Sequence, residues 1–391
     1  MNKRNSLGLI GINCCFAALS IFVGIFLVAR VYVFTGYDIV AVGVFMLLNV
    51  LMIFVFFAIS SYICKRIDAI WMIRVATVVV CLFLILTLYL GDELQNHYVL
   101  FGLLWGTGQG LFWGAMNYLI SQVSKKGSLS FFVYLNISWM IVGIIFPFTL
   151  GAAIDWGSFF LTASFVLGIG ILQLVFSFFI RLEKPESCRM RLREYFAALK
   201  EKGHLRASWG LFIVVATAGV LINIDALLSI LIIMVHGSNL SIGVLGTIFS
   251  LVGVVYLFVY NRAKKGKGIL FFIGGAMPLI GGLSLFFGVN EISLIIFYAG
   301  AVLRTVVETE ENALRLNAPK VWGGEQFAME SNLFYEFAFV CGRIVACTVL
   351  ILVGLLGASE ILLVLMICAS MAIFALHSYL LSRWKRAHSK S

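Results

Sequence analysis

Apolar stretches of about 20 residues, the length of a helix that crosses the hydrocarbon core of a bilayer, recur along the whole chain. The composition agrees with this pattern, because 62% of the 391 residues are hydrophobic and only 12% are charged. Soluble globular domains do not have this balance. A β-barrel would instead show short segments of alternating polarity. The sequence therefore predicts an all-α polytopic membrane protein.

Twelve such stretches can be delimited. They lie at 7–29, 39–62, 71–91, 98–122, 130–153, 158–181, 208–234, 240–261, 269–288, 293–314, 327–353 and 358–382. The first stretch follows a basic start and is longer than the apolar core of a cleavable signal peptide. No small-residue cleavage site closes it, so we expect it to be retained as a membrane span.

Basic residues are confined to alternate connections. Of the 28 lysines and arginines, 25 lie in the two termini, in the segment between spans six and seven, and in the even-to-odd connections on the same side. The other connections carry acidic residues, namely Asp38, Asp92, Glu93, Asp155, Glu291 and Glu360. The positive-inside rule then predicts cytoplasmic termini in a bacterial inner membrane. The net charge of +10 reflects this topology, so we expect contacts with membrane lipids and none with nucleic acid.

The two halves of the chain resemble each other. "GYDIVAVGVF" follows the first span and "GSNLSIGVLG" follows the seventh, and both second spans end in a basic turn. We therefore expect an N-terminal six-helix bundle at 1–181, a cytoplasmic linker at 182–207 and a C-terminal six-helix bundle with a basic tail at 208–391. Parallel repeats of this kind place the substrate path between the halves.

The linker has its own amphipathic pattern. Leu192, Phe196 and Leu199 recur at helical spacing among basic residues. This pattern is typical of a helix that lies at the membrane surface. A solvated linker is the alternative.

The whole chain, with its twelve spans, tandem halves and basic central segment, resembles the major facilitator superfamily. The loop "SSYICKRIDAIW" keeps Arg66 of the family's motif between helices 2 and 3, but has Lys65 where the family has aspartate. The segment "VGIIFPFTLGA" keeps Pro147 and Gly151 of the helix 5 antiport motif. The resemblance implies secondary active transport by alternating access, with export slightly favoured. It also implies that helices 1, 4, 7 and 10 line a central cavity.

The fourth span carries two columns of residues at a spacing of four. Gly102, Gly106, Gly110 and Gly114 form a ladder of small residues that lets another helix approach closely. The neighbouring column consists of Trp105, Gln109, Trp113 and Asn117. By the family resemblance, this second column faces the cavity, and we expect it to bind an amphiphilic or ring-bearing substrate. The alternative is that its amides only bond neighbouring helices.

The tenth span ends in "RTVVETEENALRL". Arg304 is expected near the membrane midplane and Glu308 one turn deeper, so the two can pair as i,i+4 neighbours. We expect Arg304 to bind an anionic group of the substrate, or Glu308 to take up a proton. An intrahelical pair in a water-filled cavity is the alternative. Glu310, Glu311 and Arg315 should be solvated at the cytoplasmic mouth.

Other charged residues fall inside spans. Asp225 stands alone in an apolar stretch and is a candidate proton carrier, unless it bonds to helix hydroxyls or a distant arginine. Glu336 and Arg343 are seven residues apart, so we expect an ion-pair network with Glu336 as a further proton site. That network could equally be structural. Arg30 either binds substrate at the outer cavity or snorkels, and Glu330 is expected near the cytoplasmic boundary.

Enzymatic and cofactor motifs are missing from the sequence. The eight cysteines form no C-x-x-C pair, and the five histidines form no H-x-x-x-H motif, so we expect no metal site. There is no phosphate-binding loop and no nucleophile motif. We therefore expect no cofactor and no enzyme.

Taken together, these features predict a monomeric, proton-coupled secondary transporter. Its expected substrate is an amphiphilic organic molecule, which could carry an anionic group or be linked to a lipid. The rivals are a non-transporting receptor or assembly protein on a transporter fold and a membrane enzyme acting on lipid.

Overall fold

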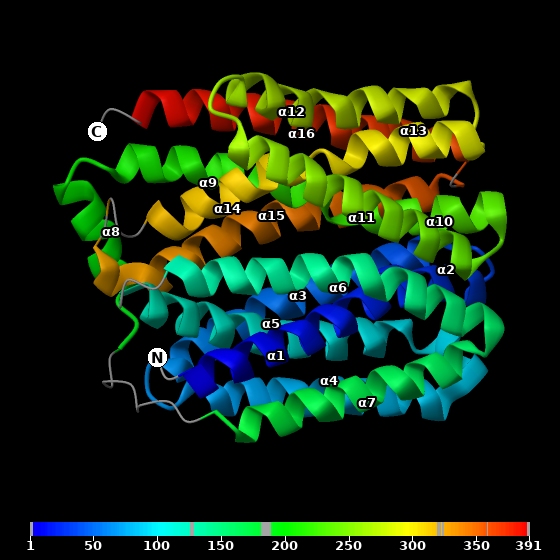
Figure 1. Ribbon diagram of the computed structural model, residues 1–391, viewed down its shortest axis with the longest axis horizontal. Helices are drawn as coiled ribbons and strands as arrows, with labels where there is room; N and C mark the ends of the chain where they lie inside the picture. The colour runs from blue at the N-terminus through cyan, green and yellow to red at the C-terminus, as the bar shows by residue number, and fades with distance from the viewer. Residues whose placement is uncertain are drawn as a thin grey trace.

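The computed structural model describes residues 3–125, 129–180, 189–318, 322, 324–357 and 359–388. Over these residues the chain forms helices and no strand. Figure 1 shows two groups of long, roughly parallel helices, with the N-terminal group below and the C-terminal group above. The expectation of an all-α membrane protein with two six-helix bundles is confirmed.

The N-terminal bundle contains the helices that precede the linker. They are α1 (Lys3–Ile21), η1 (Phe22–Leu27), α2 (Val28–Phe34), α3 (Ile39–Cys64), α4 (Ala69–Leu90), η2 (Gly91–Asn96), α5 (Tyr98–Lys125), α6 (Leu129–Trp156) and α7 (Phe159–Phe178). The linker contributes α8 (Leu192–Glu201).

The C-terminal bundle contains the remaining helices. They are α9 (Leu205–Gly219), η3 (Val220–Ile222), α10 (Asn223–His236), α11 (Asn239–Arg262), α12 (Lys267–Ser284), η4 (Leu285–Phe287), α13 (Glu291–Val302), α14 (Thr305–Ala318), η6 (Glu325–Phe327), α15 (Ala328–Leu355) and α16 (Glu360–His388).

Eleven helical segments of the described chain are long and apolar enough to cross a membrane. The twelfth expected span, at 98–122, corresponds to α5, which is 28 residues long and packs between α3 and α4. Its glycines, tryptophans and amides lower its mean hydropathy, and most of the residues that do so are covered by neighbouring helices. A helix inside a bundle can carry such residues because it does not face lipid.

The glycine ladder of α5 forms the packing seam expected from the sequence. A Cβ atom on Gly102 would lie 2.6 Å from the Phe45 carbonyl oxygen, and one on Gly110 would lie 2.5 Å from that of Ile53. Only glycine allows α5 to approach the α3 backbone this closely.

Three membrane-crossing segments are interrupted near their middles. The first span changes from α1 to α2 through the π-helical turn η1, and the seventh changes from α9 to α10 through the 3₁₀ turn η3. The tenth breaks at Leu303 and Arg304, between α13 and α14. Interruptions of this kind expose polar groups at mid-membrane depth where they line a cavity.

The bundles meet along two seams, α3 against α15 and α6 against α11. We call the end that holds both termini and α8 the basic end, and the end that holds Asp38, Asp155, Glu291 and Glu360 the acidic end. In Figure 1 the basic end is on the left.

The linker helix α8 does not present its apolar side to lipid. Tyr195 and Leu199 are buried, and the Tyr195 hydroxyl donates to Ser331 Oγ on α15 at 3.3 Å. Phe196 packs against Phe334 with ring centroids 5.1 Å apart. The expectation of a membrane-surface helix is therefore wrong for this face, because the C-terminal bundle covers it. Residues 182–188 of the expected linker lie outside the described part of the chain.

Candidate functional site

A cavity of about 490 Å³ lies between the two bundles. The N-terminal bundle contributes Ile25 of η1 and four residues of α6, including Trp139 and Pro147. The C-terminal bundle contributes the polar side of the cavity. Its polar side chains are Asp225, Ser229, Ser250, Tyr298, Arg304, Thr305 and Glu308. The volume suits an organic molecule of moderate size, and one wall is apolar and aromatic.

Arg304 holds two carboxylates at once. Its Nη2 lies 2.6 Å from Asp225 Oδ1, and its Nε lies 2.9 Å from Glu308 Oε1. Arg304 occupies the break between α13 and α14, and Asp225 lies in the first turn of α10, just after the η3 turn. The two interrupted helices therefore meet at this triad. The lone aspartate of the seventh span has a partner that the sequence separates from it by 79 residues.

The triad carries more negative than positive charge. With both carboxyls ionised, one guanidinium faces two carboxylates. The Asp225 and Glu308 side chains are 63% and 40% exposed, whereas Arg304 is 14% exposed. The two acids thus face the cavity, and the arginine lies behind them. Such a site can attract a cation or a proton. Two of the three guanidinium nitrogens of Arg304 are held by carboxylates, and the third, Nη1, is buried without a hydrogen-bond partner among the described residues.

The column predicted on the fourth span does not form the wall of the cavity. Among the described residues that line it, none comes from α5. Trp105 is buried, with its ring centroid 5.7 Å from that of Phe83. Gln109 is half-buried. Asn117 Nδ2 donates to the Trp113 carbonyl oxygen of its own helix at 3.0 Å.

One member of this column touches the site indirectly. The Trp113 ring stacks on Trp139 at a centroid distance of 5.9 Å, and Trp139 lines the cavity. The expectation that this column faces the cavity is therefore wrong for the described cavity, since none of Trp105, Gln109, Trp113 and Asn117 lines it, and substrate binding by these residues stays a prediction. The reason is that the glycine ladder packs α5 closely against α3, inside the N-terminal bundle.

Arg30 also lies away from the cavity. Its guanidinium carbon is 3.6 Å from the centroid of Phe34 and 5.4 Å from that of Phe159. This cation–π arrangement lies within the N-terminal bundle. Arg30 is not among the residues that line the cavity.

Glu336 and Arg343 form an ion pair at 3.3 Å, and Arg315 Nη1 lies 3.8 Å from the same carboxylate. The pair expected on the eleventh span is thus present. The ion pairs of the described residues connect it to Arg315 and not to Arg304, Glu308 or Asp225.

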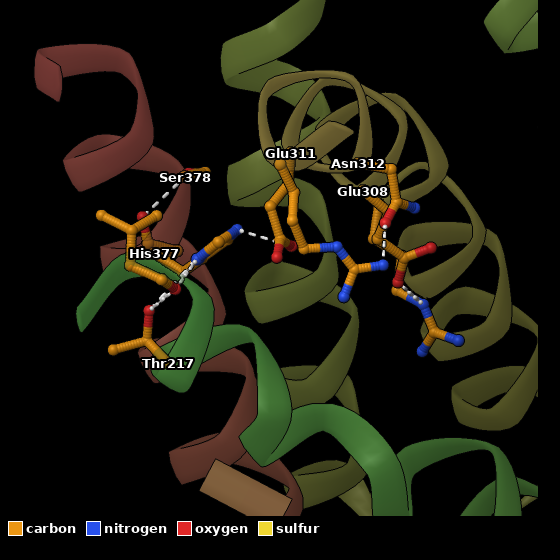
Figure 2. A network of polar contacts seen from close by, with 10 residues as sticks. Thr217, Glu308, Glu311, Asn312, His377 and Ser378 are labelled. Carbon is orange, nitrogen blue, oxygen red and sulfur yellow. Dashed lines mark hydrogen bonds and ion pairs between the residues drawn. The ribbon is translucent and has the colours of Figure 1, made fainter. Parts of the chain in front are cut away.

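The end of the tenth span is less solvated than expected. Glu311 is buried, with 3% exposure. Its Oε2 lies 3.6 Å from Nε2 of His377, which is fully buried on α16 (Figure 2). Glu310 accepts from the Tyr260 hydroxyl at 2.6 Å and pairs with Lys385. The prediction of a wetted helix end is wrong for Glu311, because its side chain is buried beside His377 of α16.

The basic end carries an ion pair between the bundles. Lys65, at the end of α3, pairs with Glu330 in the first turn of α15, and both are buried. The backbone N–H of Arg191 in the linker also donates to Glu330 at 2.8 Å. Lys65 stands where the family has aspartate, yet the two halves still contact each other at this loop through the Lys65–Glu330 pair. Its charge is matched by an acid on the opposite bundle, and Glu330 is buried where the sequence suggested a membrane boundary.

The acidic end carries a second polar contact between the bundles. Asp155 at the end of α6 accepts four hydrogen bonds from the start of α11. The donors are Ser238 Oγ, the Asn239 side chain, and the backbone N–H groups of Asn239 and Leu240, at 2.8–3.3 Å. Asp155 thus caps a helix of the other bundle.

Comparisons with known proteins show the fold and little more. No family model matches the chain. It is 24% identical over 252 residues to the uncharacterized protein YqgE of Bacillus subtilis (strain 168). That match covers 62% of this chain and 55% of YqgE, so it spans about half the length of that protein.

Solved structures are similar over the whole chain. The peptide-transporter-family protein PepTSo superposes with a TM-score of 0.76 at 11% identity, covering 100% of this chain and 99% of that one. The nucleoside transporter NupG gives 0.63 at 15% identity, with both chains fully covered. The human organic anion transporter MFSD10 gives 0.58 at 12%, covering 97% and 100%. The chain therefore has the transporter fold of the major facilitator type. All three neighbours are described as transporters.

Proposed function

We propose that this protein is a secondary active transporter that works by alternating access and exchanges an amphiphilic organic cation for protons. The observation that carries the proposal is the cavity between the bundles, with Asp225, Arg304 and Glu308 where two interrupted helices meet. A receptor or assembly protein on this fold would not need a polar cavity at this position. Polar contacts between the bundles at both ends supply two sites that can open alternately.

The charge of the triad favours a cation over the anionic group expected from the sequence. Arg304 is already paired with two carboxylates, so an anion gains little from it. The positively charged nitrogen of such a substrate can approach Asp225 and Glu308 from the cavity, while the rings of the substrate contact Trp139 and Pro147. Proton uptake by the protein opposes cation binding at this site, which gives an exchange mechanism without a further ion.

Direction and orientation complete the proposal. We place the basic end in the cytoplasm, following the distribution of lysine and arginine. Export follows from exchange, because the proton gradient of a bacterial inner membrane drives protons inward. The residues kept from the antiport motif lie on the seam between α6 and α11. Pro147 lines the cavity, and a Cβ atom on Gly151 would lie 2.5 Å from the Asn239 carbonyl oxygen.

The sign of a pH dependence tests this proposal. Ethidium is a permanently charged, ring-bearing cation, so its own charge does not change with pH. Its binding to the purified protein should tighten as pH rises, because deprotonated carboxyls bind it and protons compete. If one proton is exchanged for one ethidium, Kd should fall by about tenfold per pH unit over the range in which the site titrates. Thermal shift with ethidium, at several pH values, measures it.

Taurocholate, a permanently charged amphiphilic anion, is the matched probe. We expect it to produce no shift that depends on the triad. Tighter binding of taurocholate at low pH, together with no binding of ethidium, would show that protonation frees Arg304 for an anion. That outcome would contradict cation exchange and restore the anionic substrate expected from the sequence.

A further inference from the structure

Glu311 and His377 form a buried pair in the C-terminal bundle that the cavity does not include. Both side chains are nearly inaccessible, with 3% and 0% exposure. Figure 2 shows Glu311 of α14 pointing toward the His377 ring of α16, with Thr217 of α9 on the other side of that ring. Glu311 Oε1 and His377 Nε2 have no hydrogen-bond partner among the described residues.

The contacts of His377 assign its tautomer. Nδ1 lies 2.9 Å from the Val214 carbonyl oxygen, which can only accept, so Nδ1 carries a hydrogen. The Thr217 hydroxyl lies 3.1 Å from the same nitrogen and donates to the Val214 carbonyl. In a neutral imidazole, Nε2 then presents a lone pair toward Glu311. A carboxylate oxygen faces it at 3.6 Å, which places two acceptors opposite each other.

Two opposed acceptors become a hydrogen-bonded pair only when a proton is added between them. The proton can reside on Nε2 as imidazolium or on the carboxyl of Glu311, and in either case it satisfies both atoms. Without it, a carboxylate and a lone pair stay unsatisfied in a buried site, which is costly. We infer that Glu311 and His377 bind one proton between them and that this proton is the one exchanged for substrate.

The surroundings of the pair are mixed in charge. The charges of Glu308 and Arg315 on α14, and that of Arg343 on α15, interact electrostatically with Glu311. Glu336 partly neutralises the two arginines through its contacts with both. On α9 the groups that face His377 are uncharged, namely the Thr217 hydroxyl and the Val214 carbonyl. Lys385 and Glu310 neutralise each other in an ion pair, so they add no net charge near Glu311 and His377. The positive charges of Arg315 and Arg343 lower the free-energy cost of an ionised Glu311 carboxylate, so the proton can leave the pair.

The position of Glu311 connects the pair to the cavity. Glu308, which lines the cavity, precedes Glu311 by three residues, so the two lie on neighbouring positions of α14. Two nearby carboxylates repel each other, and a proton on Glu311 relieves this. A substrate cation at Glu308 relieves it too, and then favours release of the proton from Glu311. By reciprocity, proton uptake at Glu311 weakens cation binding at Glu308.

The overall step is balanced. One cation enters the cavity, and one proton leaves the Glu311–His377 pair to water. No bond other than the one to the proton forms or breaks. The inference rests on the proposed exchange function and names where its proton is held.

The test measures proton release directly. Ethidium is added to the purified protein in weak buffer with a pH indicator, and binding is followed separately by thermal shift. The wild-type protein should release close to one proton per ethidium bound. Glu311→Gln and His377→Gln should still bind ethidium but release at most a tenth as many protons. Glu310→Gln is the matched control on the same helix, since Glu310 belongs to the Lys385 pair, and it should release as many protons as wild type.

The outcomes separate the two proposals. If no variant and no wild-type sample binds ethidium, the exchange function itself is contradicted. If ethidium binds and Glu311→Gln releases protons like wild type, the assignment to this pair is overturned.

A spectroscopic readout covers the case in which Glu311→Gln does not fold. Infrared difference spectra of the wild type, with and without ethidium, should show loss of a carboxylic-acid carbonyl band or of the imidazolium signal. Isotope labelling of histidine assigns the latter. Glu311→Asp should keep a shifted form of the signal. Spectra without either change would contradict the inference as firmly as unchanged proton release.

Discussion

Replacing Lys65 with glutamate is expected to destabilise the protein by roughly 3–5 kcal/mol, the usual cost of breaking a buried ion pair by removing one partner. The side chains of Lys65 and Glu330 are 9% and 1% exposed, so water cannot compensate for the lost partner. The substitution would bring a second carboxylate against Glu330 between the two bundles. A large fall in the apparent Tm of the purified protein, followed by thermal unfolding, is the expected result.

The double substitution Lys65→Glu with Glu330→Lys tests whether pairing is the cause. The charge-swapped pair should recover most of the lost stability. Recovery should be incomplete, because the Arg191 backbone N–H would face an ammonium in place of a carboxylate. Arg66→Glu is the control, since Arg66 is exposed and contacts Tyr62 of its own segment, and it should change stability by less than about 0.5 kcal/mol. A double variant as unstable as Lys65→Glu alone would refute the ion-pair account.

Asp225→Asn should weaken ethidium binding by at least about tenfold, which corresponds to about 1.4 kcal/mol. The substitution keeps the size of the side chain but leaves one carboxylate for one guanidinium, so the cavity loses its negative excess. Arg304 keeps Glu308 at 2.9 Å, and the triad should not collapse. Ethidium titration at high pH, where proton competition is least, measures the change.

Glu291→Gln provides the charge-matched control for this experiment. Glu291 lies at the acidic end, its side chain is 69% exposed, and it does not line the cavity. It should bind ethidium like wild type, whereas Glu308→Gln should resemble Asp225→Asn. Unchanged affinity in both Asp225→Asn and Glu308→Gln would exclude the triad as the cation site.

The sequence predicts the fold well because the signal is repeated along the chain. Span length, charge alternation and the likeness of the halves all depend on local composition. The glycine ladder of α5 is equally local, since a spacing of four residues marks one helix face. The neighbouring column of Trp105, Gln109, Trp113 and Asn117 was nevertheless predicted to face the cavity, whereas in the structure none of these residues lines it. A helix with two unusual faces does not reveal from sequence which face its neighbours cover.

The candidate site depends on long-range pairings that a single sequence does not contain. Arg304 and Glu308 could be paired by their spacing, but the partner of Asp225 lies on another interrupted helix. Glu330 similarly meets Lys65 across 265 residues. His377 had no motif around it. Only the position of the buried Glu311 beside this histidine, which comes from a different helix, makes His377 a candidate for a role.

The measurement that tests the central claim most directly is ethidium movement in proteoliposomes that contain DNA and the wild-type protein. Potassium on both sides with valinomycin holds the membrane potential near zero, so that only a pH gradient is applied. Ethidium fluorescence on the enclosed DNA should rise faster when the interior is more acidic than the exterior, because protons leave as ethidium enters. Nigericin, which collapses the gradient, should abolish the effect. Entry that ignores the gradient, or that speeds up when the gradient is reversed, would contradict proton–cation exchange.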